Sequence, residues 1–263
     1  MIRTHINPRL QKRKQARVHR IVLLFLVGLL FLSLSILGLT YHAVRIYDVR
    51  VSGNSTVPEA DILRATEDVL ARRYLGFIPT DNALLLKRFT LANHILDIEK
   101  KIASVSISLS GLTGLRVTVV ERVPETLWCN ETCYFMDADG LVFAEAPHIS
   151  GHVYTTYEGL IDGDPIGKWY ASGKFGDLKE VISEIKQLNL DPVRMRASKD
   201  GEYEVILASG GVVRMNDRKP FAQSVLYLRT LINNGYVKTD TDFLSRIEYV
   251  DLRFGNKPFF KLR

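Results

Sequence analysis

One uncharged apolar run near the N-terminus constrains this chain more than any other feature. Residues Ile21–Thr40 carry no charge, and 15 of these 20 residues are Leu, Ile, Phe or Val. A helix of this length rises about 30 Å, the thickness of the hydrocarbon core of a bilayer. The run therefore predicts a transmembrane helix over residues 21–41. The alternative is a cleaved signal peptide, but its apolar region is usually only about 7–15 residues long and ends at a small-residue site, whereas Thr40-Tyr41-His42-Ala43 follows here.

The charges on either side of the run predict its orientation. Seven Lys and Arg residues and no acidic residue lie within residues 1–20, whereas the dozen residues after the run contain Arg45, Asp48 and Arg50. Lys and Arg are retained on the cytoplasmic side of a membrane. We therefore expect a basic cytoplasmic tail over residues 1–20, which also contacts anionic lipid, and a large extracytoplasmic part.

The net charge of +6 does not predict a nucleic-acid-binding protein. The basic tail accounts for the excess, since the rest of the chain holds 28 basic and 29 acidic residues. A nucleic-acid-binding domain would need a basic face on its folded part. We therefore expect no nucleic-acid partner.

The segment after the anchor alternates between strands and helices. The patterns predict a strand over 45–51, a helix from Pro58, a helix over 82–100 and two strands over 103–110 and 115–122. A Gly-containing turn joins the last two strands as a hairpin. The predicted order is β-α-α-β-β, in one domain over residues 45–123.

From Pro124 the pattern changes to short strands and tight turns. The predicted strands cover 127–128, 134–136, 141–143, 202–209, 212–215, 246–254 and 259–263, and the predicted helices cover 177–190 and 220–234. The whole chain is therefore predicted to be α+β. Its second domain, over residues 124–263, is expected to be a mixed β domain with two helices packed on an antiparallel-rich sheet.

Four short motifs follow the anchor in a fixed order. They are Val49-Arg50-Val51-Ser52-Gly53-Asn54, Val120-Glu121-Arg122-Val123-Pro124, the hairpin Tyr134–Phe143 and the terminal strand Tyr249-Val250-Asp251-Leu252-Arg253-Phe254. Together with the basic tail and single anchor, they resemble the bacterial division proteins of the FtsQ/DivIB family over residues 1–263. The insertion Cys129–Cys133 and the segment 144–176 depart from the family pattern.

The resemblance implies a fold and a function. It implies a POTRA-type domain over residues 45–123 and a non-catalytic role in the divisome, at the septum, in the cytoplasmic (inner) membrane. The implied partners are two small single-span coiled-coil division proteins, FtsB- or DivIC-like and FtsL-like, together with the septal peptidoglycan synthase complex. A POTRA-containing secretion or envelope-assembly factor that binds extended peptides is the alternative.

The resemblance also implies where a partner binds, because in this family a partner segment adds a strand at the end of the C-terminal sheet. The expected partner-binding residues are Arg246, Ile247, Glu248, Tyr249, Val250, Asp251, Leu252, Arg253, Phe254, Gly255, Phe259 and Phe260. In this strand Ile247, Tyr249 and Asp251 are expected to face one side, and Glu248, Val250 and Leu252 the other. The competing interpretation is that Arg253, Lys257, Pro258, Lys261 and Arg263 only protect an exposed edge from aggregation.

The only two cysteines, Cys129 and Cys133, lie in the predicted extracytoplasmic part. An even number of cysteines outside the cytoplasm favours a disulfide. The three residues between them can form a turn between short strands. We expect a disulfide, with a reduced pair as the alternative.

The remaining candidate sites do not predict an enzyme. His148 and His152 are close in the sequence, but no carboxylate lies at ligand spacing. Asp137-Ala138-Asp139-Gly140 is similar to the start of a calcium loop, but Leu141 and His148 stand where an EF-hand needs oxygen ligands. Gly163–Trp169 is one residue short of a phosphate loop. We therefore expect no catalytic residues, no metal and no cofactor.

Overall fold

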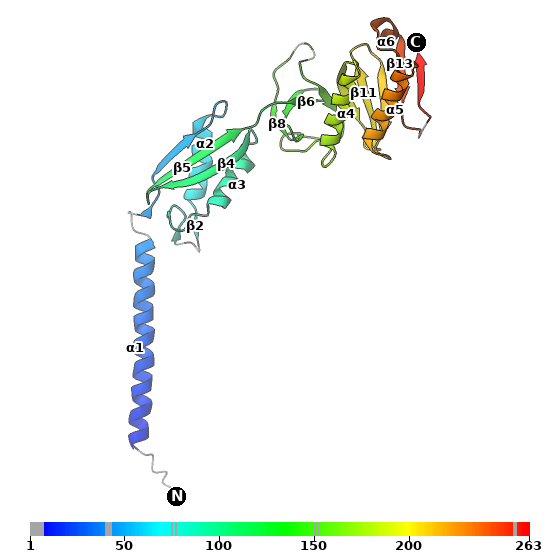
Figure 1. The fold of residues 1–263 in the computed structure, drawn as a ribbon. Coiled ribbons are helices and arrows are strands. Elements are labelled where there is room, and N and C mark those ends of the chain that lie inside the picture. The colour runs from blue at the N-terminus through cyan, green and yellow to red at the C-terminus, as the bar shows by residue number, and fades with distance from the viewer. Residues whose placement is uncertain are drawn as a thin grey trace. The chain divides into compact units, whose positions relative to one another are not determined.

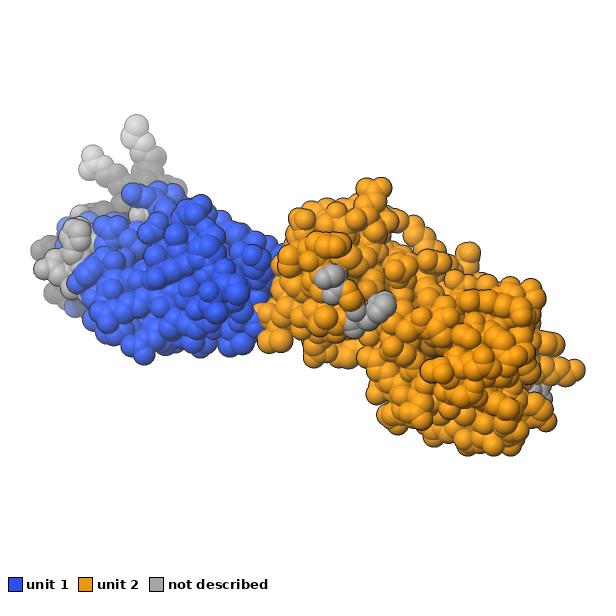
Figure 2. Space-filling model, turned by 90° about the horizontal axis from the view of Figure 1, so that it is seen from above, with its two compact units in different colours: residues 1–121 blue, residues 122–263 orange. Residues whose placement is uncertain are grey.

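The structure is a computed structural model that describes residues 8–39, 44–74, 76, 78–149, 151, 153–254 and 257–263. The chain divides into two compact units, Met1–Glu121 and Arg122–Arg263, which Figure 2 colours separately. Within the described residues there are six helices, and the two larger sheets have three and nine strands (Figure 1). The mixture of helices and sheets predicted from the sequence is confirmed.

The N-terminal helix, α1 (Pro8–Leu39), is 32 residues long. Its segment Arg17–Ser35 is long and apolar enough to cross a membrane, as the uncharged run predicts. The helix begins inside the predicted tail, so the second half of the tail continues the helix of the span. Proline is well tolerated at such a start because the first helical N–H groups have no partner within the helix. Thr40 and Tyr41, at the predicted end of the span, lie outside the described residues.

The rest of unit 1 is a sheet with two helices on one face. Its main elements are β1 (Asp48–Ser52), α2 (Glu59–Leu70), α3 (Arg88–Ile98), β4 (Ile102–Ser110) and β5 (Gly114–Glu121). β5 lies in the middle of this N-terminal sheet, parallel to β1 and antiparallel to β4. Alternate residues of β5, namely Leu115, Val117 and Val119, are buried against α2 and α3. A small hairpin that was not predicted, β2 (Arg73–Tyr74) and β3 (Ile78–Pro79), lies between the helices in sequence.

The second helix of unit 1 is shorter than the prediction of residues 82–100. Asn82 is buried, and its side-chain oxygen accepts a hydrogen bond from the Leu84 backbone N–H at 2.8 Å. This local bond holds a turn where the helical pattern had predicted a first turn of helix. At the other end, Glu99 has an extended backbone, so the helix ends at Ile98.

Glu121, the carboxylate of the second motif, connects β5 to the loop before α2. Its oxygens accept backbone hydrogen bonds from Ser55, Thr56 and Val57, the last two at 2.9 to 3.0 Å. Partial desolvation alone would raise the pKa of Glu121, but these hydrogen bonds outweigh it and lower the pKa to about 2. The motif residue therefore stabilises a loop of the fold as an ionised carboxylate.

Unit 2 is one large sheet with helices on one face. Its strands are β6 (Thr126–Cys129), β7 (Cys133–Met136), β8 (Val142–Glu145), β9 (Thr156–Glu158), β10 (Pro192–Ala197), β11 (Glu202–Leu207), β12 (Val212–Asn216), β13 (Ile247–Asp251) and β14 (Phe259–Leu262). Its helices are α4 (Phe175–Gln187), α5 (Phe221–Asn233) and α6 (Thr241–Arg246). The order across this C-terminal sheet, over the described residues, is β14-β13-β12-β11-β10-β9-β6-β7-β8. Neither β9, β10 nor α6 was predicted.

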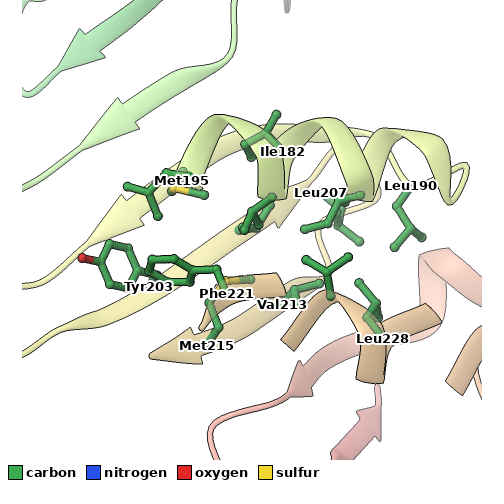
Figure 3. Close-up of a cluster of buried hydrophobic side chains, with 14 of the residues drawn as sticks. Ile182, Leu190, Met195, Tyr203, Leu207, Val213, Met215, Phe221 and Leu228 are labelled. Atoms are coloured by element: carbon green, nitrogen blue, oxygen red, sulfur yellow. The ribbon is translucent and has the colours of Figure 1, made fainter. Parts of the chain in front are cut away.

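Most neighbouring strands of the C-terminal sheet are antiparallel, but β12–β13, β9–β10 and β6–β9 are parallel. The core lies between the sheet and the helices α4 and α5. Figure 3 shows side chains of both layers pointing toward one another there, among them Ile182, Met195, Val213 and Leu228. One face of the sheet is therefore buried in the core. The opposite face and the two sheet edges remain as candidate surfaces for binding a partner.

Candidate binding edge of the C-terminal sheet

The predicted binding segment forms the last two strands of the C-terminal sheet. β13 pairs in parallel with β12 on one side and antiparallel with β14 on the other. Its backbone hydrogen-bonding groups are therefore occupied on both sides. β14 pairs with β13 alone among the strands that the structure describes. A strand added to this end of the sheet would have to pair with β14.

The direction of the backbone groups in β14 follows from one hydrogen bond. The Arg263 N–H donates to the Arg246 carbonyl at 2.7 Å, so the backbone groups of Arg263 face β13. Successive residues of a strand present their backbone groups to opposite sides. The N–H and C=O groups of Phe260 and Leu262 therefore point away from β13, toward the open edge.

Apolar side chains gather around this open edge. Phe254 is 59% exposed, Phe259 53% and Phe260 40%. The rings of Phe254 and Phe259 meet edge to face with their centroids 6.0 Å apart, and the Arg253 guanidinium lies 5.5 Å from the centroid of the Phe254 ring. Gly255 lies outside the described residues. The edge thus combines exposed aromatic rings with outward backbone groups that pair with no described strand.

The predicted alternation along the terminal strand holds from Tyr249 to Leu252 but is wrong at Ile247 and Glu248. Ile247, Val250 and Leu252 are all buried in the core of unit 2. The register of β13 against β14 shifts between Ile247 and Tyr249, which leaves Glu248 as the extra residue of a bulge. Because of this extra residue, Ile247 and Val250 both face the helices although they are three positions apart.

The bulge also decides which side chains of β13 remain accessible. Tyr249 is half-buried, and the Arg214 guanidinium lies 4.9 Å from the centroid of its ring. Glu248 forms an exposed ion pair with Lys261 of β14 at 2.8 Å. These two side chains and the aromatic cluster can meet a partner directly, whereas Ile247, Val250 and Leu252 can act only by shaping the strand.

Arg253 is a structural residue of this end of the sheet. Its guanidinium pairs with Asp251 at 2.7 Å and with Glu202 at 2.8 Å. Asp251 is buried, and burial alone would raise the pKa of its carboxyl group. Hydrogen bonds from Arg253 and the charges of Arg253 and Arg214 outweigh burial, so the pKa of Asp251 lies below its usual range. Arg253 therefore stabilises the folded sheet through these two ion pairs, and this role is more direct than protection of the edge from aggregation.

A row of alternating charges leads from this edge across the solvent-facing side of the sheet. Directly opposed residues of β9 to β13 form the row Glu158, Arg196, Glu204, Arg214 and Asp251. Three neighbouring pairs of the row are ion pairs, with N···O distances of 3.0, 3.7 and 3.0 Å. The sequence did not reveal this row, because only the strand register brings its members together. Opposite charges placed directly across strands stabilise that register.

Cys129 and Cys133 form a disulfide at the end of the β6–β7 hairpin. Their Cα atoms are 4.1 Å apart, and the two residues lie directly opposite each other across the strands. Cys129 is buried beside Leu127 and Ala146 in a small apolar cluster that is separate from the main core. The disulfide lies in the part of the sheet far from β14.

The predicted turn Asp137–Gly140 uses its first carboxylate within the fold. One oxygen of Asp137 accepts backbone hydrogen bonds from Asp139 and Leu141, at 3.0 and 2.9 Å, and the other pairs with Arg122. Among the residues whose positions the structure describes, no group of three or more His, Cys, Asp and Glu side chains could hold a metal ion. His152, one of the two histidines considered above, lies outside the described residues.

No model of a protein family matches the chain, and no curated protein matches it.

Proposed function

We propose that this chain is a single-pass membrane protein that acts as a non-catalytic scaffold and binds a partner by accepting its extended segment beside β14. The observation that carries the proposal is the open edge of the C-terminal sheet, where outward backbone groups lie next to three exposed phenylalanine rings. Backbone hydrogen bonds supply much of the affinity in such strand addition, and side-chain pockets supply the specificity.

The four motifs and their order support membership of the FtsQ/DivIB family. Under this proposal unit 1 contains a POTRA-type domain, and the protein sits in the cytoplasmic membrane at the division septum. Its partners are the FtsB- or DivIC-like and FtsL-like division proteins, through which it recruits and regulates the septal peptidoglycan synthase complex. The order β-α-α-β-β of the main elements of unit 1 is consistent with this assignment.

The proposed topology has a direct test. Single cysteines are introduced at Ser172, in the proposed extracytoplasmic part, and at Thr4, in the proposed tail, with the native disulfide left oxidised. A membrane-impermeant thiol reagent added to intact spheroplasts should label Ser172→Cys and should not label Thr4→Cys. The reverse labelling pattern would overturn the orientation and the binding proposal that depends on it.

The binding proposal is tested with the variant Phe254→Glu and the isolated extracytoplasmic segment of the FtsB- or DivIC-like partner. The variant removes an aromatic anchor and adds a charge, so binding should weaken about thirty-fold, or about 2 kcal/mol. Since Phe254 is exposed, the melting temperature should stay within a few degrees of the parent. Trp169→Glu makes a comparable change at the opposite edge of the same sheet and should leave affinity unchanged.

Equal affinity of the parent and a well-folded Phe254→Glu variant would place the binding surface elsewhere. The edge of the N-terminal sheet would then be the next candidate.

A further inference from the structure

Three loops of unit 1 meet at one end of its N-terminal sheet. The parallel strands β1 and β5 both start at this end, and β4 finishes there. The loop before α3 lies beside the loop before β1, because the Ala83 N–H donates to the Val44 carbonyl at 2.8 Å. The β4–β5 turn also lies beside the loop before β1, because the Tyr47 N–H donates to the Thr113 carbonyl at 3.0 Å. The loops before β1 and α3 and the β4–β5 turn are therefore close neighbours.

The covalent chain holds this end of the sheet near the end of α1. Helix α1 ends at Leu39, and Val44 is already bonded to Ala83. Five residues of fully extended chain span at most about 18 Å. This group of loops must therefore lie within about 18 Å of Leu39, whatever the angle between α1 and the sheet.

The same group of loops exposes large apolar side chains. Tyr47 is 76% exposed, Leu84 64%, Phe89 78% and Leu112 50%. They come from the three different loops and from the first turn of α3, and we call them the juxtamembrane face. Arg88, at the start of α3, is exposed, and so are Arg72 and Arg73. Arg72 lies next to the loop before α3, because its carbonyl accepts a hydrogen bond from the Thr80 N–H at 3.2 Å. Aromatic, aliphatic and basic residues together are typical of protein surfaces at the membrane interface.

At the opposite end of the same sheet, Ile98 of α3 and Val120 of β5 are exposed, but the loop before α2 is polar. There the loop before α2 is held by Glu121, and its exposed residues are polar, with Ser55 and Thr56 hydrogen-bonded to that carboxylate. β5 has 8 residues, so the two ends lie about 26 Å apart. The exposed apolar loops are thus found at the end of the sheet that the chain holds close to α1.

We propose that the juxtamembrane face docks on the phospholipid surface of the membrane that α1 crosses, with Leu84 and Phe89 inserted at the level of the headgroups. This inference rests on the proposed membrane anchoring of α1. The four apolar side chains lose their contact with water, and the neighbouring arginines lie near anionic headgroups. Because the face is tethered, its effective concentration at the bilayer is high, so weak individual contacts suffice. Docking restrains the tilt of the domain relative to the membrane.

The test uses the full chain in vesicles of phosphatidylethanolamine and phosphatidylglycerol with lipid-attached quenchers near the headgroups. A fluorophore is attached at Thr90→Cys or, as the matched control, at Asp97→Cys. Both positions are exposed on α3, and seven residues place them on the same helix face about 10 Å apart. Docking should make lipid quenching several-fold stronger at position 90, and a water-soluble quencher should show the opposite preference.

A second set of variants separates docking from proximity alone. Leu84→Glu and Phe89→Glu, added together to the Thr90→Cys chain, should reduce lipid quenching at position 90 to the level at position 97. Both side chains are largely exposed, so the melting temperature should be retained. Ile98→Glu, which changes an exposed apolar residue at the other end of α3, should leave the quenching at position 90 unchanged.

A label at Phe25→Cys reports on the anchor independently. Strong quenching of this label by deep lipid quenchers, with no preference for position 90 over position 97, would overturn docking and leave the anchor intact. Absence of quenching at position 25 would overturn the anchor and the docking together. Docking would also be overturned if the glutamate variants left the quenching at position 90 unchanged.

Discussion

The two edges of the C-terminal sheet differ in how their backbone groups are satisfied. At the β8 edge, the Val142 N–H donates to the Lys168 carbonyl at 2.9 Å and the Val142 carbonyl accepts from the Gly167 N–H at 2.7 Å. Leu141 also pairs with Trp169 in an isolated bridge. At the β14 edge, no described residue forms such a cover, and all four side chains of the strand are exposed.

The β8 edge is therefore covered at Leu141 and Val142, whereas the β14 edge has no such cover among the described residues. An open edge is an aggregation hazard unless it is protected or occupied. The covering residues 167–169 lie in the loop that precedes α4. The open edge is the last strand, β14, which pairs with the strand β13 that contains the terminal motif. This contrast favours β14 over β8 as the proposed binding edge.

The largest effect on folding is expected from Tyr170→Ala, beside the covered edge. Tyr170 is fully buried, its ring lies 5.3 Å from that of Tyr157 and 6.2 Å from that of Phe175, and its hydroxyl donates to the Glu158 carbonyl at 3.1 Å. Removing a buried aromatic side chain typically costs about 3–5 kcal/mol. Chemical denaturation of the full chain should show a loss of this size in the free energy of unfolding.

Tyr170→Phe is the control for this variant. It keeps the ring packing and removes only the hydrogen bond, so we expect a loss of about 1 kcal/mol. If Tyr170→Ala cost no more than Tyr170→Phe, the packing under the covered edge would not be what stabilises it.

The next largest effect is expected from Arg253→Ala, near the open edge. It leaves Asp251 buried without its main partner, and Arg253 is only 22% exposed, so we expect a loss of about 2 kcal/mol after allowing for solvent screening. The folded pKa of Asp251 is depressed, so its stabilising effect is present above the unfolded value of about 3.9 and is lost as pH falls through the lower folded pKa. The stability difference between parent and variant should therefore shrink below about pH 4.

Lys261→Ala is the matched control, because Lys261 belongs to an exposed ion pair of the same two strands. It should change the free energy of unfolding little at any pH. A loss for Arg253→Ala that is the same at pH 3 and pH 7 would show that Asp251 is not the group through which Arg253 stabilises the sheet.

A smaller effect is expected from removing the disulfide in the covered half of the sheet. The bond closes a loop between residues only four positions apart, so it removes little entropy from the unfolded chain. Cys129→Ser together with Cys133→Ser should cost about 2 kcal/mol or less. Intact mass after alkylation without reductant checks the bond itself, since an oxidised pair takes up no alkyl groups and a reduced pair takes up two.

The sequence predicted the elements whose signals are local. The uncharged run predicted the apolar segment of α1, and apolar residues at helical spacing predicted α2, α4 and α5 within a few residues. α6 also had a local signal that was missed, since the Asp240 side chain caps it by accepting a hydrogen bond from the Phe243 N–H.

The elements that were not predictable depend on distant parts of the chain. β9 has three residues and exists because it pairs in parallel with both β6 and β10, which lie far away in sequence. The same holds for the candidate site. The two strands at the chain end were predictable, but the bulge at Glu248 and the partners of Arg253 depend on strand register, which a single sequence does not determine.

The smallest effect on folding, and the sharpest test of the open edge, is expected from Leu262→Pro. Proline removes one backbone N–H, and that of Leu262 points away from β13, so the hydrogen bonds within the sheet remain. Edge strands tolerate proline at such positions. The free energy of unfolding should change by about 0.5 kcal/mol or less, whereas binding of the partner segment should weaken clearly because an outward donor is lost. Lys261→Pro is the matched variant, because its N–H faces β13, and it should destabilise the sheet more than Leu262→Pro does. If Leu262→Pro bound the partner segment as tightly as the parent, the partner would be held by the phenylalanine side chains alone, and the open edge would not act as a template for a strand.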